Sequence, residues 1–376
     1  MSFRVNPWAV EAMGAMMGRT CDAAQLYYAH ALTGASNVDE GMLLNTVFEA
    51  LDKYQALAEF NMKAGWHLAG TCSEALSKAA KYYEDTDARS AAALDATFPG
   101  PVQPPHVFNM QYNSPGNAFR DVYDAAEDPR KPGADYSGTA TPTEDTLKVG
   151  DGWPVLEITG AINDILGKVS VAGHVRDLLK HLTGTDWIEK VTTYISGDWV
   201  ELMRQGMALR DVAVAYGRIN ANVMRGWSDL APLWDGNAAG TARDWLWNYS
   251  TTASLFAGFC DQAGVAVQNF ARAAYHGLQA VDIAVDMLID TLVEFLIKAP
   301  GSADILGGLI AAVRGTVNVP ELIAGVAAGI TGVSDALDLL EAAVNAFKGV
   351  AAFKTAEEHV YTMTWPPLEY SHPAVS

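Results

Sequence analysis

The stretch SDLAPLWDGNAAGTARDW, residues 228–245, decides the expected fold, because it separates two long runs of regularly spaced apolar residues. Pro232 and Gly236 lie in it, and both residue types interrupt helices. On either side, apolar residues recur every seven positions. The repeats before the break are Leu202, Leu209, Tyr216, Val223 and Leu230, and those after it are Leu246, Ala253, Cys260, Val267, Ala274, Val281, Leu288 and Phe295. We therefore predict a long antiparallel helical hairpin over residues 197–299.

A second stripe of small and aromatic residues runs beside the first one in the later half of this hairpin. It consists of Ala242, Tyr249, Phe256, Ala263, Phe270, Gly277 and Ala284. Repeats of this kind are typical of helices that pack side by side in a bundle. At the start of the second helix, Asp235 or Asn237 is expected to act as the N-cap.

Residues 1–98 predict another helical hairpin. Its first helix covers about residues 7–32, with Asn6 as cap and Pro7 at the first helical position. A turn at residues 33–37 leads to a second helix over about residues 39–94. One apolar stripe of that helix is Leu44, Leu51, Ala58, Gly65, Cys72 and Ala79, and its neighbour contains Val47, Tyr54, Leu68, Ala75 and Tyr82.

The remaining segments differ in composition. Residues 99–154 are rich in proline and form an expected linker, in which Phe119, Val122 and Tyr123 are candidates for a short docked helix. Residues 155–196 predict short accessory helices, residues 300–354 a pair of helices rich in glycine and alanine, and residues 355–376 an extended tail. The expected fold class is all-α: an elongated helical bundle built from two long antiparallel helical hairpins plus short accessory helices.

The turn of the 197–299 hairpin resembles that of the WXG family of type VII, or ESX, secretion substrates. The resemblance is carried by Trp234-Asp235-Gly236, the small residues that follow it and Trp245, placed between two helices with seven-residue repeats. It implies that Trp234 and Gly236 form part of an export signal. The alternative is that Trp234 only fills the end of a bundle core. The first residues lack the basic start and apolar run of a signal peptide, so the resemblance implies a protein that is secreted or held in the cell envelope without a cleaved leader.

The N-terminal hairpin is similar to family members that lack Trp-x-Gly at their turn. In such members a Tyr-x-x-x-Asp/Glu motif near the end of the second helix contributes to the export signal, and Tyr83 and Asp87 match it here. A spacing of four places both residues on one helix face, where a secretion ATPase or chaperone would read them. Two observations favour a plain packing role: Tyr82 lies next to Tyr83, and Tyr123 precedes Glu127 by the same spacing.

Family substrates travel as heterodimers of two hairpins, one with Trp-x-Gly and one with the tyrosine motif at the same end of a four-helix bundle. This chain holds both hairpins, so we expect them to pack on each other as a pseudo-heterodimer. Trp234 and Gly236 would then lie near Tyr83 and Asp87 as one composite signal. The expected separation of Trp234 and Tyr83 is below about 20 Å, or four helical turns.

Composition limits the other functions. The net charge of −19 argues against nucleic acid as a partner and against electrostatic binding to anionic lipid. No phosphate loop, nucleophile elbow, dinucleotide fingerprint or metal-ligand motif is present in the sequence. We therefore expect no enzymatic activity, no cofactor and no bound metal. The aspartates at 282, 286 and 290 are read as a solvated face, or as partners for a basic residue of another helix.

The expected partners are the type VII machinery (an ATPase or chaperone), small ESX-type hairpin proteins and further copies of the chain. Such a substrate would be complete in itself or the helical export half of a toxin encoded separately. An alternative function is a membrane-active or pore-forming protein that uses the glycine-rich helices of residues 300–354. Their longest uncharged run, Leu322–Ser334, has 13 residues, whereas a membrane-spanning helix needs about 20. An unrelated helical scaffold, such as a virion component, is the third alternative.

The three cysteines do not form a disulfide framework. A turn near residue 36 would place Cys21 opposite residue 51, which is on the order of 30 Å from Cys72 along the helix. We therefore expect no bond between them. Cys260 lies in an apolar stripe and is expected to be a buried free thiol.

Overall fold

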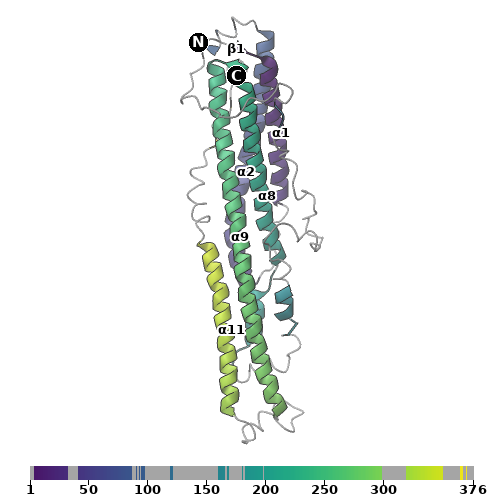
Figure 1. Ribbon diagram of the computed structural model, residues 1–376, viewed down its shortest axis with the longest axis vertical. Helices are drawn as coiled ribbons and strands as arrows, with labels where there is room; N and C mark the ends of the chain where they lie inside the picture. Colours follow the sequence, from purple (N-terminus) through teal and green to yellow (C-terminus); the bar gives the residue numbers. More distant parts are fainter. Residues whose placement is uncertain are drawn as a thin grey trace.

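Long helices dominate the computed structural model, which describes residues 4–32, 41–86, 90, 93, 95–97, 119–121, 160–165, 167–168, 180, 183–197, 199–298, 319–349, 365–366 and 370 (Figure 1). The helices with defined bounds are α1 (Pro7–Leu32), α2 (Met42–Asp85), α7 (Trp187–Ile195), α8 (Trp199–Leu230), α9 (Asn237–Lys298) and α11 (Val319–Lys348). Two short strands, β1 (Arg4–Val5) and β2 (Trp234–Asp235), complete the set. The predicted all-α class is confirmed, whereas this small sheet was not predicted.

The hairpin of α8 and α9 follows the seven-residue pattern of the sequence. Every heptad residue from Leu202 to Leu288 is buried, and so is every member of the second stripe from Ala242 to Ala284. The two helices are antiparallel, since Arg210 pairs with Asp261 at 3.3 Å near one end and Ser250 donates a hydrogen bond to Asn220 nearer the turn. The 62 residues of α9 correspond to about 93 Å of helix, which makes it the longest of the helices with defined bounds.

The hairpin of α1 and α2 has an unexpected offset. The Tyr28 hydroxyl donates to Glu59 at 3.1 Å, and the Ser73 hydroxyl donates to the Gly14 carbonyl at 2.7 Å. A Cβ atom on Gly70 would lie 3.3 Å from the Cys21 sulfur. Cys21 therefore lies beside Gly70, and its predicted position opposite residue 51 is wrong. The reason is that the first turns of α2 extend beyond the end of α1.

Helix α2 is one unbroken helix over the residues that its bounds enclose. Residues 42–85 are helical, so the predicted end at residue 94 is too late. Gly65 serves close packing instead of a break: a Cβ atom there would lie 3.0 Å from both the Tyr216 hydroxyl and the Trp365 ring. The offset part of α2 also packs on α9, where the rings of Tyr54 and Phe259 stack at 4.5 Å.

The two hairpins pack on each other through a shared core and through two buried tyrosines of the second hairpin. Tyr249 donates its hydroxyl to the Gly65 carbonyl at 3.0 Å, and Tyr216 donates to the Met62 carbonyl at 3.4 Å. Burial raises the pKa of both phenols, so they stay neutral donors. The expectation that the hairpins pair within one molecule is confirmed. Their apolar stripes cover each other, as in a four-helix bundle.

The second half of α9 has a different neighbour. There α11 runs antiparallel to it (Figure 1), and the glycine face of α11 lies against Thr291, Leu288 and Ala284 of α9. On another side, the Lys168 ammonium contacts both Asp282 and Asp286 at 2.8 Å, which agrees with the alternative of a basic partner that the sequence left open beside a solvated face. Within the described ranges, no helix is long and apolar enough to cross a membrane. The helix expected at residues 303–316 lies outside the described residues.

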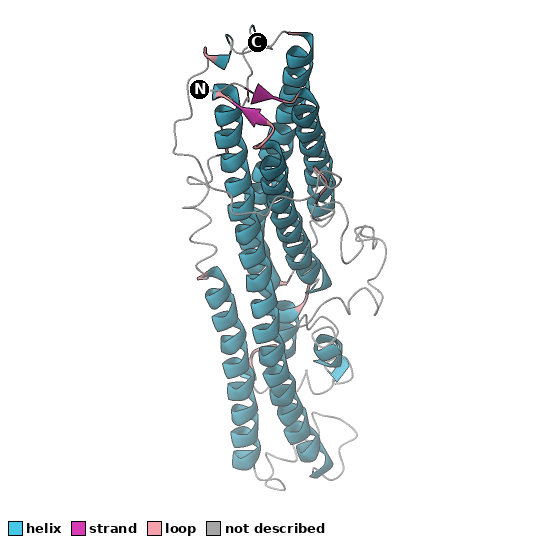
Figure 2. Cartoon of the chain, turned by 45° about the horizontal axis from the view of Figure 1, so that its top comes forward, coloured by secondary structure: helices cyan, strands magenta, loops and turns pink. Residues whose placement is uncertain are grey.

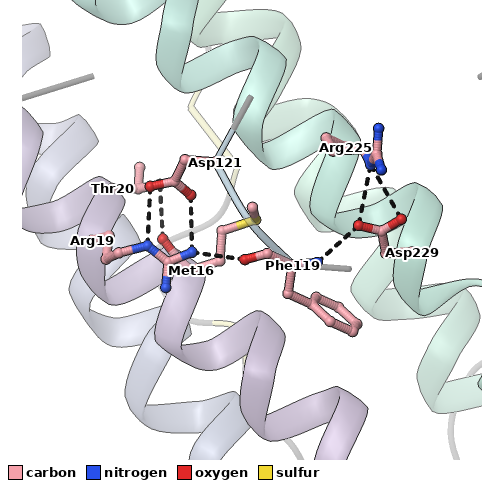
Figure 3. Close-up of polar contacts among 7 residues, drawn as sticks. All are labelled: Met16, Arg19, Thr20, Phe119, Asp121, Arg225 and Asp229. Carbon is pink, nitrogen blue, oxygen red and sulfur yellow. Dashed lines mark hydrogen bonds and ion pairs between the residues drawn. The ribbon is translucent and has the colours of Figure 1, made fainter. Parts of the chain in front are cut away.

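A short part of the linker crosses the seam between the hairpins (Figure 3). Arg19 of α1 donates to both carboxylate oxygens of Asp121, at 2.9 and 3.0 Å, and to the Phe119 carbonyl at 2.9 Å. From the other side, the Asp229 carboxylate of α8 accepts the Phe119 N–H at 2.9 Å and pairs with Arg225 at 3.2 Å. We call these five residues the linker clamp.

The clamp holds Phe119 in a conformation that it would not adopt by itself. Its φ angle is +60°, a left-handed value that costs a non-glycine residue about 1–2 kcal/mol. The ring is buried and meets Trp8 edge to face at 5.9 Å. Phe119 therefore docks as expected, but it lies in a turn and not in a helix. The other two docking candidates, Val122 and Tyr123, lie outside the described residues.

Thiol reactivity offers a direct check of this packing. All three cysteines are free; Cys72 and Cys260 are buried and Cys21 is half-buried. Burial raises the pKa of the Cys21 thiol, and the neighbouring Asp22 adds to the rise. Since the thiolate is the reactive form, Cys21 is expected to react more slowly at pH 8 than a thiol in a peptide, and its rate should keep rising at higher pH. Cys72 and Cys260 should react only after unfolding.

Alkylation of the native protein over a pH series, with the modified sites identified by mass spectrometry, measures this order. The urea-unfolded chain, in which all three thiols are exposed, serves as the control. Reaction of Cys72 at the rate of Cys21 in the native protein would contradict the described packing of α2.

Candidate functional site

One end of the bundle brings together segments that are far apart in the sequence, and we call it the tip (Figure 2). The tip comprises β1, Tyr83 of α2, Asp95 and the turn between α8 and α9. Here β1 pairs antiparallel with β2, with Arg4 opposite Asp235 and Val5 opposite Trp234. The Asn6 N–H donates to the Leu233 carbonyl at 2.9 Å, and α1 begins at the next residue. The N-terminal segment therefore fixes the turn between α8 and α9 from outside.

The start of α9 is capped by a residue from the first half of the chain. The two oxygens of the Asp95 carboxylate accept the N–H groups of Asn237 and Ala238, both at 2.8 Å. A negative charge at this position also suits the positive end of the helix dipole. The sequence offered Asp235 or Asn237 as the cap, and the structure shows a cap from Asp95, which was not predicted. Sequence spacing gave no indication of this, because Asp95 lies 142 residues before Asn237.

Gly236 of the Trp-x-Gly turn meets two separate requirements for glycine. Its φ angle is +136°, which residues with a side chain rarely adopt. A Cβ atom would also lie 2.7–2.9 Å from the Asp95 carboxylate. The turn and the cap thus require each other: the carboxylate reaches the first amides of α9 only because residue 236 has no side chain.

Trp234 and Tyr83 meet at the tip. Their ring centroids are 6.2 Å apart and the planes are inclined at 71°, an edge-to-face contact. The predicted separation of less than about 20 Å is confirmed. Asp87 lies outside the described residues, and α2 ends at Asp85, two residues before it. Gly236 belongs to the same group of residues, because it packs against the Asp95 carboxylate that caps α9.

Both aromatic residues are buried, with 2% of Trp234 and 6% of Tyr83 exposed. Burial raises the pKa of the Tyr83 phenol, and the nearby Asp95 carboxylate adds to the rise. The Trp234 indole N–H offsets part of this rise in the Tyr83 pKa, but its geometry is not that of a full hydrogen bond to the phenol. A buried polar group in this state costs about 1–3 kcal/mol. The burial of Tyr83 agrees with the packing role that the sequence left open for it beside a role in recognition.

Two aromatic residues near the C-terminus pack against α2 and α9, along the helices that lead away from the tip. Trp365 donates its indole N–H to the buried Asn61 side chain at 3.0 Å, and its ring lies 5.3 Å from that of Tyr249. Tyr370 is buried, and its ring meets Trp245 at 6.5 Å. Burial raises the pKa of Tyr370, with Tyr83 the largest contribution among its neighbours. We call Trp365 and Tyr370 the tail anchors.

The sequence pointed to Trp234, Gly236 and Tyr83 but missed the residues that surround them. Asp95, Arg4 and Val5 carry no local pattern that marks them. The aromatic residues in the proline-containing tail were a usable signal, since isolated aromatics in an extended segment commonly act as anchors.

The described residues include no group of histidine, cysteine and acidic side chains able to hold a metal ion. Comparisons with models of protein families, with curated proteins and with solved structures found no match to this chain. A function is therefore inferred from the geometry of the tip.

Proposed function

We propose that this chain is a non-enzymatic substrate of a type VII secretion system, with a composite export signal at the tip. The observation that carries the proposal is the contact between Trp234 and Tyr83, the two motif residues contributed by different hairpins. Gly236 supports it, because the fold gives this glycine a specific role in the turn. In this proposal the recognising partner is the ATPase or chaperone of the secretion machinery, and the destination is the cell envelope or the medium.

The packing of the hairpins supports a self-contained substrate. In a heterodimeric substrate each hairpin needs a separate protein to cover its apolar face. Here the stripes of α2 and α9 are buried within one chain, and covalent linkage gives the two halves a high effective concentration. A small ESX-type partner is therefore not needed to complete the bundle. The glycine face of α11, on which the pore-forming alternative depends, is packed against α9.

The proposal is tested by export from a host that carries a type VII system. Trp234→Phe and Tyr83→Phe, made singly, are each expected to lower the exported fraction about tenfold, as for aromatic residues at the centre of a binding site. The protein in the medium is measured against the protein in the cells. Purified variants are compared by thermal unfolding, so that loss of signal is distinguished from loss of fold.

Matched controls come from the opposite end of the four-helix region. Trp199 is as buried as Trp234 and stacks on Phe270 at 6.0 Å, and Tyr54 is as buried as Tyr83. Trp199→Phe and Tyr54→Phe should leave export unchanged. Normal export of both tip variants, or equal losses in the control variants, would refute the composite signal.

A further inference from the structure

Helix α11 and the second half of α9 form an antiparallel pair at the end of the molecule away from the tip (Figure 1). Two close approaches mark the line along which the helices touch. A Cβ atom on Gly277 of α9 would lie 2.5 Å from the Leu340 side chain of α11, and one on Gly329 of α11 would lie 2.8 Å from the Leu288 side chain of α9. These contacts fix both the facing sides of the two helices and their relative position along the axis.

The large exposed apolar side chains of this pair lie on one side of it. Each residue turns an α-helix by about 100°, so Met287 is displaced from Leu288 around α9 by the same angle, and in the same sense, as Leu339 from Leu340 around α11. In antiparallel helices such displacements lead to the same side of the pair. Ile283 precedes Met287 by four residues and shares its face. Ile283 is 62% exposed, Met287 58% and Leu339 59%. We call this side the outer face.

The outer face carries less negative charge than the chain as a whole, whose net charge of −19 repels a second copy. The acidic side chains Asp282 and Asp286 turn to another side of α9, where they contact a lysine. On α11, Leu339 is accompanied by the exposed small residue Ala328, and Asp335 stands at the edge of the face. Small side chains allow the backbone of another helix to come close. The outer face therefore suits contact with further helices.

Two polar side chains of α9 are placed symmetrically about Ile283. His276 precedes it by seven residues and Asp290 follows it by seven, and both are exposed. Steps of seven residues return to the same side of a helix. If the α9 of a second copy lies antiparallel across the first, with Ile283 on the two-fold axis, His276 of each copy lies beside Asp290 of the other. An imidazole N–H can donate to a carboxylate, so this contact forms twice.

The same axis gives a complementary match on α11. Leu288 lies at the level of Gly329 and Ala284 at the level of Gly332, so Ile283 lies at the level of residues 333–334. At equal distances on either side of that level, Leu339 of one copy meets Ala328 of the other. A large side chain then packs on a small one at both symmetric positions.

The outer face is also large enough for a stable contact. The 30 residues of α11 give a pair about 45 Å long, and two helices of about 10 Å diameter make it about 20 Å wide. One side of the pair thus offers about 900 Å², compared with about 800 Å² buried by each partner in a stable complex.

We propose that the outer face is an interface between two copies of this chain, with Ile283 of both copies on the two-fold axis. The contact is isologous, since the same residues serve on each side. Because the two α9 helices are antiparallel, the two tips lie at opposite ends of the dimer. The proposal is independent of the export signal, since it uses the other end of the molecule.

The test is sedimentation equilibrium of the full chain over a concentration series. The natural protein is expected to be a dimer. Ile283→Glu and Met287→Glu combined bring like charges together at the axis, which should weaken dimerisation at least about 100-fold. Both side chains are mostly exposed in the single chain, so thermal unfolding of the dilute variant should show an intact fold. The control, Phe60→Glu, changes an apolar side chain of α2 that is 65% exposed, and it should dimerise like the natural protein.

A second set of variants tests the register. His276→Asp faces Asp290 of the other copy with a like charge and should weaken the dimer about tenfold. Adding Asp290→His restores opposite partners, so the double variant should recover most of the loss. In a Cys21→Ser background, Ile283→Cys should form a disulfide between copies on oxidation, because the two residues meet at the axis. Phe60→Cys in the same background should not.

Three results would overturn the proposal. The first is a natural protein that stays monomeric at about 100 μM, far above the Kd of a typical interface of this size. The second is a dimer that survives the two glutamates at Ile283 and Met287, or that Phe60→Glu weakens equally, since another surface would then join the copies. The third is a dimer in which Ile283→Cys forms no disulfide and the exchange of His276 and Asp290 restores nothing, because the axis would then lie elsewhere.

Discussion

Replacing Asp229 with alanine is expected to destabilise the protein by about 3 kcal/mol, the scale measured when one member of a buried ion pair is removed. The carboxylate is 2% exposed and its partner Arg225 is 12% exposed, so water cannot readily replace the lost contact. The change also removes the acceptor of the Phe119 N–H. Because that bond helps to hold Phe119 at a left-handed φ angle, the linker clamp should open as well. Equilibrium urea unfolding followed by circular dichroism measures the loss.

The matched control is Asp261→Ala. Asp261 also pairs with an arginine, Arg210, but the two side chains are 53% and 33% exposed. Exposed pairs of this kind contribute about 0–1 kcal/mol, so the variant should unfold close to the natural protein. If the Asp229 and Asp261 variants lose similar amounts of unfolding free energy, burial of the linker clamp does not contribute to stability.

Gly236→Ala is expected to destabilise the protein by about 2–4 kcal/mol, because two unfavourable effects add. The φ angle of +136° strains any residue with a side chain, and the new Cβ atom would meet the Asp95 carboxylate at 2.7–2.9 Å. Relief of the clash moves Asp95 off the first amides of α9. Thermal and urea unfolding report the stability, and hydrogen exchange at Asn237 and Ala238 reports the cap.

Two further variants separate strain from clash. Gly217 lies on the exposed side of α8, where an added Cβ atom has no neighbour within 4 Å. Gly217→Ala should therefore be neutral or stabilise by up to about 1 kcal/mol, as alanine favours helix. Combining Gly236→Ala with Asp95→Ala should cost less than the sum of the two single changes, since the clash is then absent. Strict additivity would mean that Asp95 does not press on residue 236.

The helices could be predicted because their information is local and repeated. Leu202 and Leu209 bury the same stripe one heptad apart, and repetition over many turns outweighs any single exception. The helix predicted over residues 7–32 agrees with α1, and the turn at Pro232 and Gly236 separates α8 from α9. The approach of Trp234 to Tyr83 was expected from the resemblance to heterodimeric secretion substrates, because the stripes predict that the two hairpins pair but not which of their ends meet.

The details of the tip could not be predicted because they depend on single contacts between distant residues. Asp95 caps α9 with one side chain, and the pairing of Val5 with Trp234 involves a strand of two residues. The offset of α1 against α2 was also hidden, because an apolar stripe fixes which face is buried but not the position of its partner along the helix axis. Gly65 illustrates the limit, since its place in an apolar stripe did not show that Tyr216 and Trp365 need the space beside it.

The tip draws on four segments, at β1, Tyr83, Asp95 and the α8–α9 turn. Contacts between residues so distant along the chain close slowly, because each closure orders a long intervening loop. During synthesis the α1–α2 hairpin can form as soon as its two helices have left the ribosome, whereas Trp234 emerges more than a hundred residues after Tyr83. A nascent chain therefore passes through a period in which its first helices are paired and Tyr83 is still open to any protein waiting to receive it.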